Sequence, residues 1–505
     1  MPDLLPEQLR LMAGHHPDEV AFIDVSAGTE LTFAQWEARS NRLARWLIGR
    51  GVAKGDRVAV HVPPAEPELF LVAYAAAHKA GAVAVPTSTR LVARELAFVL
   101  GHAGAVVVVT GTSTLPALLE ATPELPELRT VVTTGDVDDP PGAIDLVPWD
   151  EATDADDSPV QVEVDGSDIA DVMYTSGTTG RPKGVVVRHG NIAMIPNGLP
   201  AWSGSGWLHS SPMFTFAGIA SVYNPMKLGM RLLYLPRFDV DAWFDAVEHH
   251  RPSATFLVPA MAELLIANDR FDTAELSSIT LCPLGSAPLA PATFDTLRRR
   301  LPNAMVSNSW GMTEAGPAYC SMPSDEVDRR VGSVGRPVPP VEFRVVDADG
   351  NDLPPRTVGE LLVRNPGRER EYFRDPDATS RTWQDGWLHT GDLAELDEDG
   401  YLYLRGRAKD VIIRGGNNVH AGDVESVLYE HPAVREAAVA AVPHDVLGED
   451  VGAWVVLNDG SAATEEELRE FCAERLSDYK VPRRWTFMDE LPRNPTGKVL
   501  KRDLQ

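Results

Sequence analysis

Residues Tyr174 to Gly184 read YTSGTTGRPKG and follow the apolar segment Ile169 to Met173. The pattern predicts a strand that leads into a loop with three glycines, five hydroxyl side chains and one lysine, Lys183. Backbone amides, hydroxyl donors and a cation are the groups that hold polyphosphates. The Walker A spacing is absent, because Lys183 precedes Gly184 instead of following a glycine. We therefore predict a phosphate-binding loop, with a plain flexible turn as the alternative.

The chain before this loop alternates helical and strand patterns. Apolar residues recur at helical spacing in some segments, and short Val- and Ala-rich runs indicate buried strands in others. This alternation predicts an α/β fold with parallel sheets covered by helices. We expect helices at 32–49, 69–80 and 94–102, and strands at 57–62, 82–85 and 106–110. Residues 134–166 are acidic and rich in proline and glycine, which predicts a surface connection.

The sequence pattern changes at Val341, from alternating helices and strands to short strands separated by turn dipeptides. Strands are expected at 341–347, 359–364 and 401–404, which predicts a small β subdomain over residues 341–406. A compact α/β unit follows, with helices expected at 423–430 and 464–476 and strands at 437–442 and 451–456. We therefore predict an N-terminal domain over residues 1–406 and a C-terminal domain over residues 407–505.

The composition is that of an ordinary globular protein. The 505 residues correspond to roughly three domains, and 44% hydrophobic with 24% charged residues argues against a disordered, fibrous or membrane-spanning chain. The formal charge of −27 disfavours nucleic-acid binding. We expect no secretory signal and no integral membrane segment, and we expect Cys282, Cys320 and Cys472 to be buried thiols in a reducing compartment. These features predict a cytoplasmic protein.

Six further segments accompany the glycine-rich loop in a characteristic order. They read GSAPL (285–289), WGMTE (310–314), GWLHTGD (386–392), GRAKD (406–410), RGGNNV (414–419) and PTGK (495–498). Together they resemble the motifs of the adenylate-forming superfamily, which includes acyl-CoA synthetases, aryl-CoA ligases, luciferases and the adenylation domains of non-ribosomal peptide synthetases. The resemblance implies two related α/β sheet subdomains and a β subdomain, followed by a mobile C-terminal α/β domain.

The resemblance implies that ATP and Mg²⁺ bind in the N-terminal domain and that Lys498 acts in catalysis. The loop would hold the β- and γ-phosphates, Glu314 with Thr313 would help to bind Mg²⁺, and Lys498 would bridge the substrate carboxylate and the α-phosphate. Asp392 and Arg407 would bind the ribose, Trp310 would stack on adenine, and residues 285–287 would lie along the adenine edge. The expected ATP- and AMP-binding residues are Thr175, Ser176, Gly177, Thr178, Thr179, Gly180, Lys183, Gly285, Ser286, Ala287, Trp310, Gly311, Met312, Asp392 and Arg407.

Each of these side chains also has an ordinary structural interpretation. A lysine near the C-terminus is usually a surface residue, and an aspartate in a Thr-Gly-Asp turn is often a turn cap. Arg407 would otherwise form a surface salt bridge, and Trp310 would belong to the core.

The resemblance implies two half-reactions: ATP first converts the acid to an acyl-adenylate, and a thiol must then reach this intermediate. In the family this follows rotation of the C-terminal domain, and Lys409 matches the hinge position. Arg414, Gly415 and Gly416 would line the pantetheine tunnel, with a plain hairpin turn as the alternative. Lys480 and Arg483 would meet the phosphates of CoA, and an exposed basic stretch is the alternative for them.

The segment Pro212 to Gly218 (PMFTFAG) resembles the family segment that walls the acyl pocket. Thr215 stands where a histidine is usual, and it cannot supply the carboxylate that pairs with an amino-acid substrate. The expected substrate is therefore a carboxylic acid with an uncharged tail. The pocket residues implied are Met213, Phe214, Thr215, Phe216, Gly218 and Tyr223, and core packing is the alternative for the aromatic ones.

The motifs together predict an ATP- and Mg²⁺-dependent acyl-CoA synthetase that binds a small carboxylic acid, ATP and CoA. A stand-alone enzyme that loads a separate carrier protein is the main alternative. A luciferase-like oxidase and a degenerate member that only senses nucleotide or acyl ligand are further alternatives.

Overall fold

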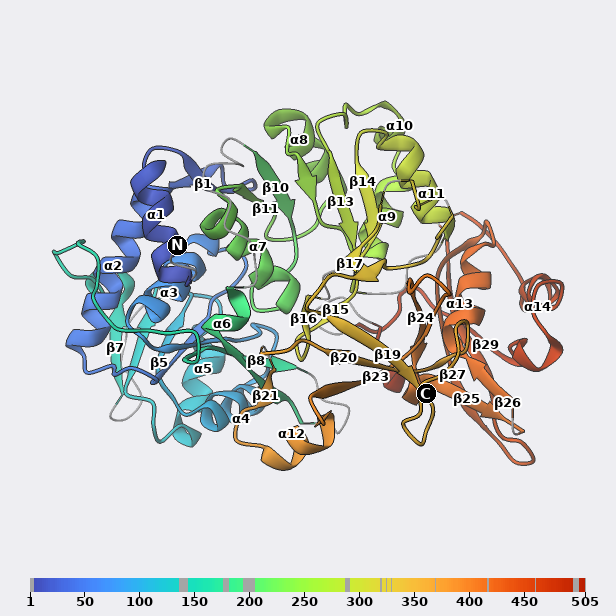
Figure 1. Ribbon diagram of the computed structural model, residues 1–505. Helices are drawn as coiled ribbons and strands as arrows, with labels where there is room; N and C mark the ends of the chain where they lie inside the picture. Colours follow the sequence, from blue (N-terminus) through green and yellow to red (C-terminus); the bar gives the residue numbers. More distant parts are fainter. Residues whose placement is uncertain are drawn as a thin grey trace.

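The computed structural model describes most of the chain (Figure 1). The described ranges are 4–135, 144–175, 181–193, 205–286, 291–317, 320–323, 325–327, 329–367, 369–415, 417–458, 460–493 and 499–504. Within these ranges, no helix is long and apolar enough to cross a bilayer.

The first α/β unit is built on an eight-stranded sheet in the order β21-β9-β8-β4-β3-β5-β6-β7. The strands from β8 to β7 run parallel to their neighbours, while β9 and β21 are added antiparallel at one edge. The strands are β3 (Arg57–His61), β4 (Val83–Pro86), β5 (Ala105–Thr110), β6 (Thr130–Thr133), β7 (Asp145–Pro148), β8 (Ile169–Thr175), β9 (Lys183–Arg188) and β21 (Glu371–Tyr372). The helices of this unit are α2 (Phe33–Gly49), α3 (Pro67–Lys79), α4 (Ala93–Ala103), α5 (Leu115–Ala121) and α6 (His189–Ile192).

The second α/β unit is built on a seven-stranded sheet in the order β14-β13-β12-β10-β11-β1-β2. Its strands are β1 (Val20–Asp24), β2 (Thr29–Thr32), β10 (Gly206–His209), β11 (Arg231–Tyr234), β12 (Ala254–Thr255), β13 (Leu281–Leu284) and β14 (Met305–Asn308). Its helices are α1 (Leu5–His15), α7 (Phe216–Leu228), α8 (Val240–His250), α9 (Pro259–Ile266), α10 (Arg270–Thr273) and α11 (Pro291–Arg300). One hydrophobic cluster contains residues of α1, α2, α3 and α7 together with strands of both sheets, so the two units share a core.

The β subdomain follows the second unit. Its five-stranded sheet contains β19 (Glu342–Val346), β20 (Gly359–Arg364), β22 (Trp383–Gln384), β23 (Trp387–Leu396) and β24 (Leu402–Arg407), with α12 (Pro376–Thr382) beside it. Four short strands lead into it, namely β15 (Gly311–Met312), β16 (Gly316–Pro317), β17 (Cys320–Ser321) and β18 (Arg336–Pro337).

The C-terminal α/β unit lies at the right of Figure 1 and contacts β24 through α13. It contains β25 (Val411–Arg414), β26 (Asn417–His420), β27 (Val434–His444), β28 (Gly448–Leu457) and β29 (Arg484–Phe487), with α13 (Ala421–Tyr429) and α14 (Glu465–Ala473). A single 3₁₀ turn, η3 (Ala408–Asp410), joins it to β24. The predicted α/β class and element order are confirmed, whereas the domain boundary after residue 406 stays a prediction.

Two details of the sequence interpretation were wrong. Residues 134–166 are not only a surface connection, because β7 forms the parallel edge strand beside β6. Cys282 and Cys472 are buried, but Cys320 is partly exposed, on the short β17, which forms a two-stranded sheet with β18 apart from the main sheets.

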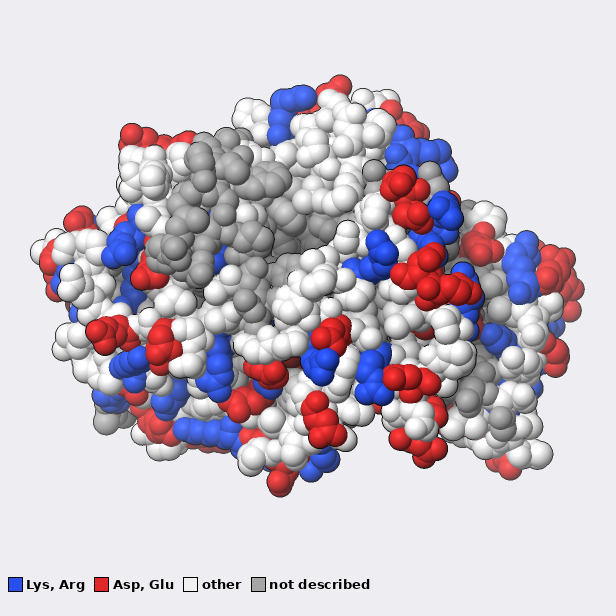
Figure 2. All heavy atoms as spheres, viewed as in Figure 1, with Lys and Arg blue, Asp and Glu red and all other residues white. Residues whose placement is uncertain are grey.

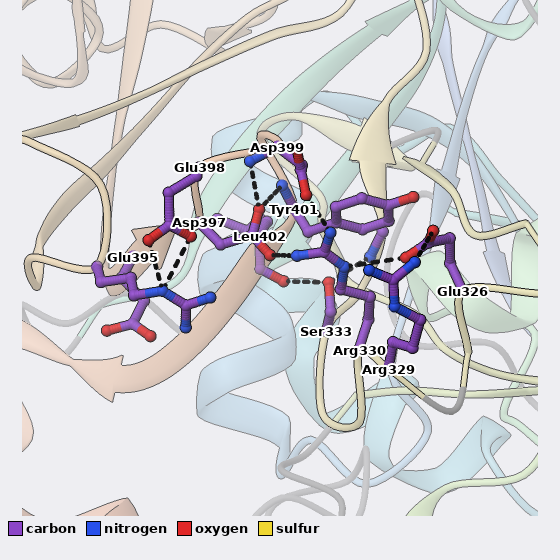
Figure 3. Close-up of polar contacts among 12 residues, drawn as sticks. Glu326, Arg329, Arg330, Ser333, Glu395, Asp397, Glu398, Asp399, Tyr401 and Leu402 are labelled. Atoms are coloured by element: carbon purple, nitrogen blue, oxygen red, sulfur yellow. Dashed lines mark hydrogen bonds and ion pairs between the residues drawn. The ribbon is translucent and has the colours of Figure 1, made fainter.

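A network around Arg330 fixes the turn between β23 and β24 (Figure 3). The Arg330 guanidinium forms ion pairs with Asp397, with Asp399 and, at 3.1 Å, with Glu326. It also lies 4.5 Å from the ring centroid of Tyr401. Asp397 is buried, so removal of Arg330 would leave a buried carboxylate without its cation.

We expect Arg330→Met to lower the midpoint of thermal unfolding by several degrees, because Asp397 would lose its counter-ion in a buried position. Arg329→Met is the matched control, since the Arg329 side chain is 71% exposed and pairs with Glu326, three residues earlier in the chain. Thermal denaturation followed by circular dichroism measures both variants. Equal midpoints for the two variants would contradict the structural role of Arg330.

Three histidines are buried at the ends of elements in the two sheet units: His61, His189 and His209. Burial lowers the pKa of His61 to about 4, that of His189 to about 3 and that of His209 to about 4. Desolvation disfavours the charged imidazolium, so these side chains stay neutral in the folded protein.

The free energy of unfolding should decrease as the pH falls from 6.5 towards 5. The folded pKa values lie below the unfolded value of 6.5, so unfolding takes up protons in this range. Each histidine contributes a slope of at most about 1.4 kcal/mol per pH unit. Urea denaturation between pH 7.5 and 5 measures the slope, and His61→Gln should reduce it. A free energy that does not change with pH would contradict the prediction.

Candidate active site

The two strands that flank the glycine-rich segment, β8 and β9, are antiparallel neighbours in the eight-stranded sheet. Strand β8 ends at Thr175 and β9 begins at Lys183, and these two residues are paired across the hairpin. Because β8 is parallel to β4, the loop leaves the carboxyl edge of the parallel strands, where α/β folds usually bind ligands. Ser176, Gly177, Thr178, Thr179 and Gly180 lie outside the described residues.

Glu314 lies beside this hairpin, in the tight turn between β15 and β16. Its Oε1 accepts hydrogen bonds from Thr175 Oγ1 at 3.4 Å and from the Tyr372 hydroxyl at 3.2 Å. The Lys183 Nζ lies 4.7 Å from the ring centroid of Tyr372. The structure therefore brings the predicted Thr175, Lys183 and Glu314 together, and it adds Tyr372.

The Glu314 carboxylate suits a magnesium ion. Both hydrogen bonds go to Oε1, and Oε2 accepts none from the residues that the structure describes. An ionised carboxylate oxygen is a ligand that Mg²⁺ prefers, together with phosphate oxygens. Thr313 was predicted to assist Glu314. Its main-chain carbonyl accepts a hydrogen bond from the Arg370 guanidinium.

The predicted adenine edge lies at the carboxyl ends of two adjacent strands. Gly285 follows β13 and Trp310 follows β14, and these strands are parallel neighbours. A side chain at Gly285 would place its Cβ 2.9 Å from the Ser309 carbonyl oxygen, so close packing requires glycine there. Ser286 has a φ of 72°, in the left-handed region, and Ala287 lies outside the described residues.

The predicted nucleoside residues meet at the carboxylate of Asp392. Trp310 Nε1 donates to Oδ2 at 2.9 Å, and Arg407 Nε pairs with Oδ1 at 2.7 Å. Asp392 and Arg407 are register partners on β23 and β24. Asp392 is buried, and its carboxylate joins separate parts of the chain instead of capping its own turn.

Two residues of the acyl segment, Thr215 and Gly218, have structural roles. Thr215 Oγ1 accepts from the Gly218 amide at 3.0 Å and donates to the Pro212 carbonyl at 2.8 Å, so this hydroxyl caps helix α7. A Cβ at Gly218 would lie 1.9 Å from the Pro212 oxygen, which excludes any larger residue. Their sequence similarity to the pocket motif therefore also reflects the tight start of α7.

The aromatic and apolar residues of this segment point in different directions. Met213 and Phe214 line a small hollow whose other walls are Val62, Pro63, Pro64, Pro67, Phe70 and Tyr234. The Phe216 ring lies 5.7 Å below the Arg370 guanidinium, near the Thr313 carbonyl. Tyr223 is buried, and its hydroxyl lies 3.1 Å from that of Tyr74 and 3.3 Å from Asp171. Tyr223 therefore belongs to a buried polar cluster.

The predicted CoA-binding cations of the C-terminal unit are all engaged in ion pairs. Lys480 pairs with Asp423 at 2.7 Å, Arg483 with Asp478 at 2.6 Å and Arg414 with Asp450 at 2.5 Å. Gly415 has a φ of 54° at the tip of the β25–β26 hairpin. Lys409 is exposed within η3, while Gly416 and Lys498 lie outside the described residues.

The sequence analysis missed two site residues, Arg370 and Tyr372. Both lie in a stretch without a motif, and their contacts with Thr313 and Glu314 join residues 57 and 58 positions apart. Residues 364–375 mix arginine with acidic residues, so the charge of Arg370 offered no distinctive signal in the sequence.

Comparison with known proteins identifies the family. Residues 9–373 match the family of AMP-binding enzymes, and residues 423–498 match the AMP-binding enzyme C-terminal domain. The chain is 33% identical to the long-chain-fatty-acid–CoA ligase FadD13 of Mycobacterium tuberculosis, covering 98% of this chain and 96% of the relative. It is 36% identical to a feruloyl-CoA synthase of Amycolatopsis sp, covering 95% and 94%.

Two other proteins extend the comparison. The fatty acid–[acyl-carrier-protein] ligase ScoC of Streptomyces coeruleorubidus is 32% identical, covering 98% of this chain and 94% of the relative. The crystal structure of ATP-bound MatB from Rhodopseudomonas palustris superposes with a TM-score of 0.88 at 31% identity, covering 100% and 98% of the two chains. The chain belongs to the AMP-binding enzyme family and is an acid–thiol ligase of the adenylate-forming superfamily.

Proposed function

We propose that the protein is an AMP-forming acyl-CoA synthetase that activates a carboxylic acid with an uncharged tail. The observation that carries the proposal is the convergence of two residue groups from distant segments. Thr175, Lys183 and Glu314 form one group, and Trp310, Asp392 and Arg407 form the other. Residues 310 and 314 lie on one short segment, which links the two groups, and a nucleotide on the second group would direct its phosphates towards the first.

In the adenylation step the substrate carboxylate attacks the α-phosphorus and pyrophosphate leaves. Two anions approach each other, so positive charge and hydrogen-bond donors must be placed in advance. Lys183 and the amides of the loop would hold the β- and γ-phosphates, and Lys498 would bridge the carboxylate and the α-phosphate. Glu314 would hold Mg²⁺, which would supply positive charge to neutralise the phosphate oxygens.

The ribose would bind at Asp392 and Arg407. Each carboxylate oxygen of Asp392 has a second lone pair beyond its bond to Trp310 or Arg407, so it can also accept a ribose hydroxyl. The indole of Trp310 keeps an aromatic face for adenine while its edge donates to Asp392. Gly285 and Ser286 would lie along the adenine edge.

In the thioester step the C-terminal unit would rotate about η3, with Lys409 as the hinge. This 3₁₀ turn is the connection between β24 and β25, and Lys409 is exposed there. Arg414, Gly415 and Gly416 would then line the path of the pantetheine thiol. Lys480 and Arg483 would meet the phosphates of CoA by exchanging their present carboxylate partners, Asp423 and Asp478.

ATP and CoA are both polyanions, and a few local cations must hold them. The chain carries a formal charge of −27, and acidic and basic side chains intermix over the face shown in Figure 2. Long-range attraction therefore does not gather ATP and CoA on this surface. The three scattered cysteines and the soluble-protein composition support a cytoplasmic location.

The acyl tail would contact the apolar side chains of Met213, Phe214 and Phe216. The side chains around Met213 and Phe214 are proline, valine and aromatic residues, and an apolar surface of this kind suits an uncharged tail. Loading of a carrier protein is the second candidate, because ScoC is named as a carrier-protein ligase and is similar over nearly its whole length.

We expect pyrophosphate release with ATP, Mg²⁺ and an apolar acid from a panel of fatty and aryl acids, and formation of the CoA thioester of the same acid. Thioester formation on a holo-carrier protein but not on CoA would select the second candidate. The absence of pyrophosphate release with every acid, despite ATP binding, would favour a nucleotide sensor.

Lys498→Ala should abolish pyrophosphate release and spare thioester formation from a supplied acyl-adenylate.

We expect Trp310→Phe to raise the KM for ATP about tenfold, because a hydrogen bond to a charged group contributes about 1.5 kcal/mol or more. Phenylalanine keeps an aromatic face and removes the donor that lies 2.9 Å from Asp392. The KM for the acid should stay within twofold. Initial rates of pyrophosphate release at varied ATP and acid measure both constants, and an equal rise in the two would contradict the assignment.

A further inference from the structure

Tyr372 lies between two oppositely charged side chains of the candidate ATP site. Its hydroxyl donates to Glu314 Oε1 at 3.2 Å, and its ring centroid lies 4.7 Å from Lys183 Nζ. Lys183 and Glu314 form no ion pair with each other in the part of the chain that the structure describes. The phenol therefore contacts the anion with its edge and the cation with its face.

The backbone and neighbours of Tyr372 hold the ring in this position. Strand β21 pairs with β9, where Tyr372 lies opposite Val185, two residues beyond Lys183. The Tyr372 amide donates to Thr379 Oγ1 at 2.9 Å, and Trp383 packs edge-on against the ring at 5.2 Å. These contacts fix the ring on two sides, through the backbone of β21 and through Trp383.

A direct ion pair would work against both partners. Lysine bound to Glu314 would be withdrawn from the phosphates, and the carboxylate would be neutralised before the metal arrives. Tyr372 instead gives each group a neutral partner, a hydroxyl for the carboxylate and an aromatic face for the ammonium. The hydroxyls of Tyr372 and Thr175 both donate to Oε1 of Glu314, so Oε2 is left to bind a metal ion.

We propose that Tyr372 is a positioning residue that separates Lys183 from Glu314 and aligns each of them for its own part of Mg²⁺–ATP. This inference rests on the proposed function, because it assumes that Lys183 meets the phosphates and that Glu314 meets the metal. It concerns the state before ATP binds, in which the two charges would otherwise pair.

Two substitutions separate the roles of the ring and the hydroxyl. Tyr372→Phe keeps the ring against Trp383 and Lys183 and removes the bond to Glu314, whereas Tyr372→Leu removes both. The measurement is the dissociation constant of ATP by calorimetry, first in EDTA and then with saturating Mg²⁺. The value in EDTA reports on Lys183, and the ratio of the two values reports on Glu314.

For Tyr372→Phe we expect ATP affinity in EDTA within twofold of the parent and a loss of about fivefold in the Mg²⁺-dependent gain. For Tyr372→Leu we expect the same loss and, in addition, about tenfold weaker binding in EDTA. Tyr429→Phe is the matched control, because it removes a buried hydroxyl that donates to the Ala437 carbonyl at 3.3 Å, away from the site. It should change neither value.

Glu314→Gln, measured in parallel, separates failure of this inference from failure of the proposed function. It should reduce the Mg²⁺-dependent gain at least as far as Tyr372→Phe does. A reduction with Glu314→Gln and none with Tyr372→Phe would overturn the positioning role and leave the proposed function standing. No reduction with Glu314→Gln would overturn the metal role on which both rest.

Discussion

The carboxylate of Asp392 joins the three segments on which the candidate site depends. Trp310 arrives from the end of β14, Asp392 lies on β23 and Arg407 ends β24. A buried carboxylate must be paired or hydrogen-bonded, and here the partners come from the second α/β unit and from the β subdomain. The two units are therefore held in one relative arrangement at the point where the nucleoside is proposed to bind. The connection to the C-terminal unit begins directly after Arg407.

The second support of this arrangement is Arg330 at the far end of the same hairpin. It ties the turn after β23 to the segment that follows the Glu314 motif, while Ser333 Oγ donates to the Leu402 carbonyl at 2.9 Å. Strands β23 and β24 are thus anchored at both ends. If η3 is the hinge proposed above, this anchored hairpin would confine the rotation to the few residues of the connection.

The candidate site must bind two anionic substrates with only a few charged side chains. ATP and a carboxylate are both anions, and the chain as a whole is strongly acidic. Lys183 and Glu314 must therefore coexist at short range without neutralising each other, and Tyr372 lies between them. Similarly, Arg370 places its guanidinium over Phe216 while it donates to the Thr313 carbonyl. It links the proposed acyl wall to the proposed metal-binding turn.

The sequence by itself determined the family, the α/β class, the order of elements and the motif residues Lys183, Glu314, Trp310, Asp392 and Arg407. These follow from local patterns, since periodicity, turn residues and short motifs are encoded in neighbouring positions. Only the tertiary structure decided that Trp310 donates to Asp392, that Thr215 caps α7 and that Tyr223 belongs to a buried polar cluster. It also decided the places of Arg370, Tyr372 and the edge strand β7. The physical reason is that such contacts join residues far apart in the chain, and their geometry is set by how the sheets and helices pack.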